Sequence, residues 1–318
     1  QGIPFHDRML GKVELMGRVG TFFAPLSNWA IRNPVHRWLL EKVCGIHRNR
    51  LLPEYASETF RRWFDKRPTP QASAGDRKAA LFYTCSVNFN DPAVGKACVS
   101  VLEKNRVHVR CPEQRCCGMP LLDGGDIDAT RASAHANIES LYPLVHAGYD
   151  VVVPGPTCSY MLKREYPTLI DGEKAQAVAA RTFDICEYLM ALHSSGKLDT
   201  GFVRAVGRIA YQMPCHLRAQ NIGYKSRDLM QLIPDTTVRL IEKCSAIDGT
   251  WGLKEQYYDI SRKVAEPLVR EVRESQPDLT VSDCPLAGLQ IQEGTGKRTL
   301  HPVQVLAIAY GMAEGRTR

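Results

Sequence analysis

The sequence predicts an α/β protein in which two related βαβ domains follow a basic helical arm. From residue 78 onward, short apolar segments alternate with helix-like ones, the pattern of parallel sheets covered by helices. Cysteines recur at offsets of 130, 128 and 126 residues in the pairs Cys85 and Cys215, Cys116 and Cys244, Cys158 and Cys284. Landmarks repeated in this way indicate an internal duplication. We expect an arm and linker over 1–75, a first domain over 76–200 and a second over 201–318.

The arm carries most of the excess positive charge. Residues 1–70 hold 12 Lys and Arg against 6 Asp and Glu, whereas the rest of the chain holds 29 against 28. Apolar spacing predicts helices over 9–19, 35–43 and 56–64, followed by a linker over 68–75. The arm either contacts an acidic partner or anionic lipid, or presents an ordinary solvated basic face. The nearly neutral remainder predicts no nucleic-acid partner, and the sequence lacks a run of about 18 apolar residues that would span a membrane.

Each half of the body is expected to contain three strands separated by helices. In the first half, strands are predicted over 79–83, 107–109 and 149–153, with helices over 92–102, 126–146 and 181–192. In the second half, strands are predicted over 207–213, 237–241 and 278–282, with helices over 227–232, 253–274, 286–293 and 302–312. Seven repeat-matched cysteines follow these strands. Because functional groups gather beyond the carboxyl ends of parallel strands, we expect the seven thiols at the edges of two Rossmann-like domains.

The doublet Cys116-Cys117, followed by Gly118, is the centre of the first predicted site. Adjacent cysteines do not pair with each other without strain, and Gly118 allows the backbone to bend so that both thiols face one ligand. With Cys85 and Cys158 they form a set of four thiols. Soft thiolates suit iron–sulfur clusters and zinc alike, but the C-x2-C spacing of structural zinc sites is missing here. We expect these four cysteines to bind a [4Fe–4S] cluster, with zinc as the alternative.

The second predicted site has three thiols, from Cys215, Cys244 and Cys284. Ser245 stands where the second cysteine of the doublet would be, and Ala246 stands where Gly118 would be. His216 either supplies a nitrogen ligand or is a hydrogen-bonded histidine at a strand end. An incomplete protein shell suits a catalytic site that binds a substrate sulfur, and it equally suits a vestigial copy. The sequence leaves both interpretations open.

The number of cysteines also bears on the cellular compartment and on the role of the cysteines outside the two predicted sites. Eleven cysteines, an odd number, occur without an export signal, which indicates a reducing cytoplasm and metal-binding thiols rather than disulfides. Cys44, Cys98 and Cys186 have no repeat partner and are expected to be small apolar core residues. Cys111 is either a fourth residue of that kind or a fifth ligand.

Several motifs resemble one known family. The doublet with Gly118, together with Cys85 and Cys158, resembles the cysteine-rich CCG domain. That domain occurs twice in the B subunit of heterodisulfide reductase, and also in the C subunit of anaerobic glycerol-3-phosphate dehydrogenase and in iron–sulfur subunits of glycolate and lactate oxidation. The segments most similar to the glycerol-3-phosphate dehydrogenase branch are 213–218, 249–252, 282–285 and His301-Pro302. The resemblance covers roughly residues 78–312 and extends to the basic arm.

The resemblance implies electron transfer or disulfide reduction through iron–sulfur clusters. It implies ferredoxin-like or flavoprotein partner subunits, and a place in the cytoplasm or at the membrane periphery through residues 1–70. The heterodisulfide reductase type completes each cluster with a C-x-x-C, and here Gly155 and Ala287 replace one cysteine of each. Non-cubane clusters are therefore not expected. The ferredoxin-like N-terminal region common in this branch is also missing, so we expect a piece of a longer protein, beginning at Gln1, or a variant subunit.

Three functions remain as hypotheses. The first is an iron–sulfur subunit that carries electrons to an acceptor. The second is a heterodisulfide, thiol–disulfide or quinone reductase whose catalytic residues are Cys215, Cys244 and Cys284. The third is a zinc-stabilised scaffold that binds a partner through residues 1–70.

Overall fold

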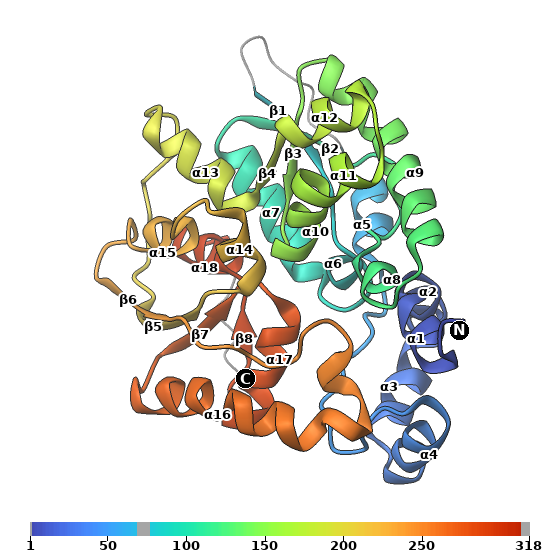
Figure 1. Cartoon of the computed structure of the whole chain (residues 1–318). Helices are drawn as coiled ribbons and strands as arrows, with labels where there is room; N and C mark the ends of the chain where they lie inside the picture. The colour runs from blue at the N-terminus through green and yellow to red at the C-terminus, as the bar shows by residue number, and fades with distance from the viewer. Residues whose placement is uncertain (1, 69–76, 313–318) are drawn as a thin grey trace.

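Two parallel sheets with the same strand order form the body of the protein (Figure 1). The computed structural model describes residues 2–68 and 77–312. The first sheet has the order β2-β1-β3-β4 and the second the order β6-β5-β7-β8, and every neighbouring pair is parallel. The strands are β1 (Arg77–Leu81), β2 (Val107–Arg110), β3 (Asp150–Val153), β4 (Thr182–Asp184), β5 (Gly207–Gln212), β6 (Thr236–Ile241), β7 (Leu279–Ser282) and β8 (Thr299–Leu300). The predicted α/β class with duplicated Rossmann-like domains is confirmed.

The last strand of each sheet differs from prediction. The apolar pattern predicts a helix from residue 181, whereas β4 takes up Thr182–Asp184 before α13 begins. No strand is predicted where β8 lies. Both strands are edge strands of two or three residues. Such short segments show no alternation that sequence inspection can detect, and their pairing with β3 and β7 creates them.

Helices cover both sheets, and proline begins several of them. Pro92, Pro285 and Pro302 occupy the first turns of α7, α17 and α18, where their missing N–H costs nothing. The helices of the first domain are α6 (Cys85–Phe89), α7 (Pro92–Lys104), α8 (Met119–Asp123), α9 (Ile127–His146), α10 (Pro156–Tyr160), the π-helical η1 (Met161–Glu165), α11 (Tyr166–Leu169), α12 (Glu173–Ala180) and α13 (Ile185–Ser194). Those of the second domain are α14 (Cys215–Gln220), α15 (Lys225–Met230), η2 (Trp251–Leu253), η3 (Glu255–Tyr257), α16 (Tyr258–Glu274), α17 (Pro285–Thr295) and α18 (Pro302–Ala309).

One apolar core joins the two domains. Leu102 of α7, Leu189 of α13 and Leu306 of α18 are fully buried in a single cluster that also includes residues of both sheets. Because apolar burial is the main driving force of folding, this shared cluster holds the two sheets in one body. The carboxyl ends of the strands of both sheets are thereby brought near each other.

The arm packs along one side of the body and touches both domains (Figure 1). It consists of α1 (Phe5–Gly11), α2 (Val13–Phe22), α3 (Ala24–Arg32), α4 (Pro34–Cys44) and α5 (Phe60–Lys66). Phe60 is fully buried in the shared core, whereas the buried Arg50 donates to Ser261 Oγ (3.0 Å) and to Gln290 in the second domain. Residues 69–75 of the predicted linker lie outside the described residues. Within the described part of the chain, no helix has the length and apolarity needed to cross a membrane.

Candidate metal centre at the strand ends

The carboxyl ends of the strands position all seven repeat-matched cysteines. Cys85 begins α6 just after β1, and Cys215 begins α14 just after β5. Cys158 lies in α10 after β3, and Cys284 is the N-cap of α17 after β7. The doublet and Cys244 lie in the loops that follow β2 and β6. The helix bearing Cys158 begins at Pro156.

The structure brings the four thiols of the first site together. The Sγ atoms of Cys117 and Cys158 are 3.3 Å apart. Cys116 shares hydrogen bonds with Cys117 and Cys85, and these bonds hold the pKa of the Cys116 thiol well below its ordinary value. The same bonds, together with burial, raise the pKa of Cys85 and of Cys117. The site therefore offers four soft sulfur donors, and the neighbours of one of them stabilise it as a thiolate. Zinc and iron–sulfur clusters both take such ligands.

Gly118 fulfils the conformational role expected of it. Its φ is +93°, a region that favours glycine, and an added Cβ would lie 3.1 Å from Thr130 Cγ2. The backbone N–H groups of Gly118 and Cys117 point at Cys116 and help to lower its pKa. The bend therefore places two backbone donors against the Cys116 sulfur, and hydrogen bonds of this kind tune a metal centre.

Three residues that sequence reasoning missed hold the doublet in place. Asn137 donates to the carbonyls of Arg115 and Cys116 (both 3.3 Å) and to Tyr166 Oη (2.9 Å), and it accepts from the Arg115 N–H (2.7 Å). Tyr166 in turn donates to the Cys117 carbonyl (3.0 Å). Glu14 of the arm accepts the Cys116 N–H (3.3 Å). Asn137 lies in the interior of the helix predicted over 126–146. An asparagine inside a helix is the one feature of the sequence that could have indicated its role in holding the doublet.

The second site is looser and more exposed. Cys215 and Cys244 are exposed and hydrogen-bonded to each other. The bond from Cys215, together with the Ala246 N–H at 3.3 Å, lowers the pKa of Cys244 to about 6, and the same bond raises that of Cys215. Burial raises the pKa of Cys284, which lies within electrostatic range of both Cys215 and Cys158. Cys284, a thiol of the second site, thus lies near Cys158 of the first site.

Ala246 keeps the backbone conformation of the glycine that it replaces. Its φ is +55°, in the same left-handed region as Gly118. A non-glycine residue in this region costs roughly 1–2 kcal/mol. The second loop therefore retains the bend of the first even though the glycine is gone, which favours a working site over a decayed copy.

His216 contacts the first domain. Its Nδ1 is 2.9 Å from Thr157 Oγ1, and its ring stacks on Tyr160 with 5.1 Å between centroids. Burial lowers the pKa of the imidazole. These contacts favour the interpretation of His216 as a hydrogen-bonded histidine at a strand end. Because Nδ1 is engaged with Thr157, a metal would have to bind the other ring nitrogen, Nε2.

Of the cysteines without a repeat partner, Cys186 comes nearest to a predicted site, because its Sγ donates to Oδ1 of Asp283, the residue before Cys284 (3.9 Å). Cys98 and Cys186 are fully buried in the shared core, and Cys44 is half-buried. Cys111 packs partly against the core, and burial raises the pKa of its thiol. All eleven cysteines are free thiols.

The fold and the site together define this chain as a two-domain α/β protein with thiols at matching strand ends. Comparison with known proteins shows the family to which it belongs. The family model of the cysteine-rich domain (CCG) matches twice, over residues 79–163 and 209–292. The chain therefore belongs to the CCG cysteine-rich domain family, as the doublet motif suggested.

Named relatives extend over most of the chain. It is 32% identical over 308 residues to the C subunit of anaerobic glycerol-3-phosphate dehydrogenase from Escherichia coli K12, covering 95% of this chain and 76% of that protein. It is 27% identical over 236 residues to the B subunit of fumarate reductase (CoM/CoB) from Methanothermobacter marburgensis, covering 73% and 45%. It is also 27% identical over 245 residues to lactate utilization protein A of Geobacillus kaustophilus, covering 72% and 98%.

Proposed function

We propose that this chain is an iron–sulfur subunit of a redox complex that carries electrons to an acceptor. The main support is the contact among the thiols of Cys85, Cys116, Cys117 and Cys158 at one sheet edge. Four thiolates are the ligand set of a [4Fe–4S] cluster, which takes up and releases one electron when bound. The names of the relatives, two of which are oxidoreductase subunits, support a redox role within a complex of several subunits. We expect the partner subunits to be ferredoxin-like or flavoproteins.

The surrounding residues would tune such a centre. Asn137 and Tyr166 hold the carbonyls of the doublet, so they fix the direction of the Cys116 and Cys117 thiols. The Glu14 carboxylate lies close enough to raise the pKa of Cys85. Negative charge beside a cluster disfavours the added electron, so Glu14 would lower the reduction potential.

The second site would pass electrons onward. Cys284 lies in electrostatic range of Cys158, so the two sites are near neighbours. Cys215 and Cys244 face solvent, where an external acceptor has access. With Cys284 they supply three thiols, which leaves one coordination position open. Either His216 Nε2 or a substrate sulfur would fill that position.

A reductase active at this site is the second candidate. The low pKa of Cys244, beside the exposed Cys215, is the property of a thiol pair that attacks disulfides. Replacing Cys284 with Ser should then abolish disulfide or quinone reduction while the EPR signal of the first cluster persists. Unchanged turnover in that variant would remove the reductase hypothesis.

Elemental analysis decides between iron and zinc. After anaerobic purification we expect iron and acid-labile sulfide in nearly equal amounts, with about four iron atoms per chain if the first site alone is filled. Stoichiometric zinc without iron or sulfide would instead support the zinc-stabilised scaffold and overturn the redox proposal.

The arm would hold this protein against an anionic membrane surface. Its helices expose a set of large apolar side chains: Phe5, Leu15, Val19, Phe22, Phe23, Leu26, Trp29, Val35, Trp38, Leu39 and Val43. Phe22 is 80% exposed, and the arm has a net positive charge. Apolar and aromatic side chains beside basic ones are typical of interfacial helices. The free thiols favour the cytoplasmic side.

Vesicle sedimentation tests the arm. The chain should sediment with phosphatidylglycerol vesicles, and less so with phosphatidylcholine vesicles or at high salt. Phe22→Ser with Trp29→Ser should weaken this binding about tenfold or more, because both side chains are exposed and lie outside the buried core. Equal sedimentation of the double variant would contradict membrane docking.

A further inference from the structure

The central strand of the second sheet ends in a buried polar side chain. β5 lies between β6 and β7, and its last residue, Gln212, pairs with Ser282 at the end of β7. Both side chains are buried. The three thiols of the second site follow these three strands, so Gln212 lies at the point from which all three cysteine loops begin.

The first sheet has apolar side chains at the same two positions. The offset of 130 residues between the halves places Phe82 at the position of Gln212. The register of the strand pairs likewise places Val153 at the position of Ser282, and both apolar residues are buried. A buried amide and hydroxyl are unfavourable unless they are hydrogen-bonded, so the polar pair of the second sheet requires partners.

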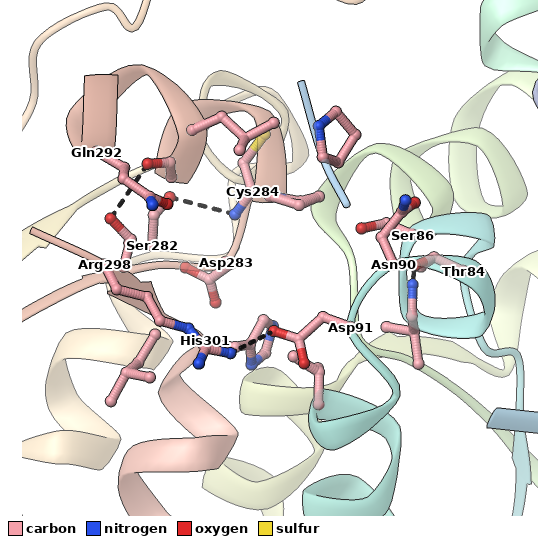
Figure 2. A pocket seen from close by; sticks show the side chains of 18 of the residues that line it. Thr84, Ser86, Asn90, Asp91, Ser282, Asp283, Cys284, Gln292, Arg298 and His301 are labelled. Carbon is pink, nitrogen blue, oxygen red and sulfur yellow. Dashed lines mark hydrogen bonds and ion pairs between the residues drawn. The ribbon is translucent and has the colours of Figure 1, made fainter. Parts of the chain in front are cut away.

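Those partners are backbone groups of the cysteine loops. Gln212 Nε2 donates to the carbonyls of Met213 (2.9 Å) and Lys243 (3.3 Å), and its Oε1 accepts from Ser282 Oγ (2.8 Å). Ser282 Oγ in turn accepts the Cys284 N–H (3.2 Å). Figure 2 shows this last bond, which reaches the backbone nitrogen of the cysteine itself.

The hydrogen bonds form one continuous chain through the second site. It starts at Lys243, the residue before Cys244, passes through the two buried side chains and ends at Cys284. A branch reaches Met213, two residues before Cys215. A shift of one loop relative to the others would leave a buried donor or acceptor unpaired, which is costly. The chain therefore fixes the spacing of the three loops.

The exposed thiols need such an internal support. Cys215 and Cys244 lie at the surface, where few packing contacts restrain a loop. A ligand set works only when the side chains that carry it are held in the productive geometry by their neighbours. A polar pair that is buried beneath three surface loops, and bonded to each of them, meets this need.

We propose that Gln212 and Ser282 are positioning residues of the second site, and that they hold Cys215, Cys244 and Cys284 around one shared metal centre. This role rests on the proposed function, because it requires the three thiols to share a centre. Residues that orient metal ligands in this way change metal affinity by about 10- to 100-fold when they are replaced.

Cadmium titration of the full chain tests the positioning role. Soft thiolates bind soft metal ions, so after anaerobic removal of any bound metal we expect two cadmium ions per chain, one at each cysteine set. Chelator competition gives the two affinities, and the near-ultraviolet thiolate-to-cadmium absorption reports the thiolates bound. Cys244→Ser identifies the event that belongs to the second site. Gln212→Met keeps a similar side-chain length without the amide, and it should weaken that event about tenfold or more.

The first site and a neighbouring strand residue provide the controls. Cadmium affinity at the four-thiol site should stay unchanged in Gln212→Met and in Ser282→Ala, whereas the absorption of the second site should fall in both. Thr280 is a buried residue on the same strand and the same face as Ser282, but its hydroxyl donates to the Arg298 carbonyl (2.8 Å). Thr280→Val should therefore leave both affinities unchanged.

Each remaining outcome overturns the positioning role. These outcomes are native affinity at the second site in both variants, an equal loss at the first site, an equal loss in Thr280→Val, or a single cadmium ion bound by the native chain. Ser282→Ala removes only one hydroxyl, so it decides the question if Gln212→Met fails to fold. Iron and sulfide analysis of the chain as purified reports separately on electron transfer, because cadmium binding requires neither.

Discussion

At the scale of single residues, the sulfur of Cys117 is the most enclosed of the four thiols in the first site. Cys98 is equally a buried cysteine, but it lies in the apolar core away from the other thiols. The pair offers a matched comparison, because each substitution by Ala removes one buried sulfur. We expect Cys117→Ala to lose most of the bound iron and Cys98→Ala to keep it, at a stability cost on the order of 1 kcal/mol.

Iron content and thermal unfolding of both variants check this prediction. Equal iron in the two variants would mean that Cys117 is not a ligand. Loss of iron in both would instead indicate a general effect of destabilisation.

Cys244 should show a distinct pH dependence in metal-free protein. Its pKa of about 6 lies below the ordinary thiol value because Cys215 and the Ala246 N–H donate to its sulfur. The thiolate is therefore present above about pH 6 and is lost as the pH falls through that value. The rate of alkylation by iodoacetamide should follow this fraction, and Cys215→Ser should change the midpoint. A midpoint near pH ~8.5 in the native chain would contradict the hydrogen-bonded pair.

At the scale of elements, the two cysteine loops share one bend but place different residues in it. Gly118 and Ala246 both have positive φ, but only one of them is a glycine. Ala246→Gly should stabilise the chain by about 1 kcal/mol by relieving the left-handed strain, and Gly118→Ala should destabilise it by a similar amount or more. The Thr130 contact makes the second change the larger one. Denaturant unfolding of both variants measures the difference, and shifts of the same sign would refute the shared bend.

Most helices and strands could be predicted from sequence because their signals are local. β2 and β6 follow short apolar runs, and α9 and α16 follow long periodic segments, so their ends agree with prediction within a few residues. The first arm helix was wrong, since a break at Lys12 divides it into α1 and α2. Gly11 ends α1 at this break, and a single glycine within an apolar helical pattern is a weak signal of a helix end. β4 and β8 were not predicted because only their pairing with β3 and β7 makes these short segments strands.

At the scale of the whole molecule, Arg50 links the arm to the second domain. Its side chain is fully buried, paired with Glu293 at 3.4 Å and bonded to Ser261. Arg50→Ala would leave Glu293 with only the half-exposed Arg262 as a cation partner among the described residues, so we expect a loss of about 3 kcal/mol. Hydrogen exchange should then increase in α4 and in the carboxyl-terminal half of α17 before it increases in β1. Unchanged protection of the arm would show that it is held by the first domain alone.

The sequence by itself determined the duplication, the parallel βαβ order and the position of seven thiols after strands, because each depends on local apolar runs and on fixed spacing along the chain. Only the tertiary structure decided which groups meet across the domain interface. His216 of the second domain contacts Thr157 of the first, and Cys284 lies near Cys158. Such contacts arise from packing between segments far apart in the chain, and no local periodicity encodes that packing.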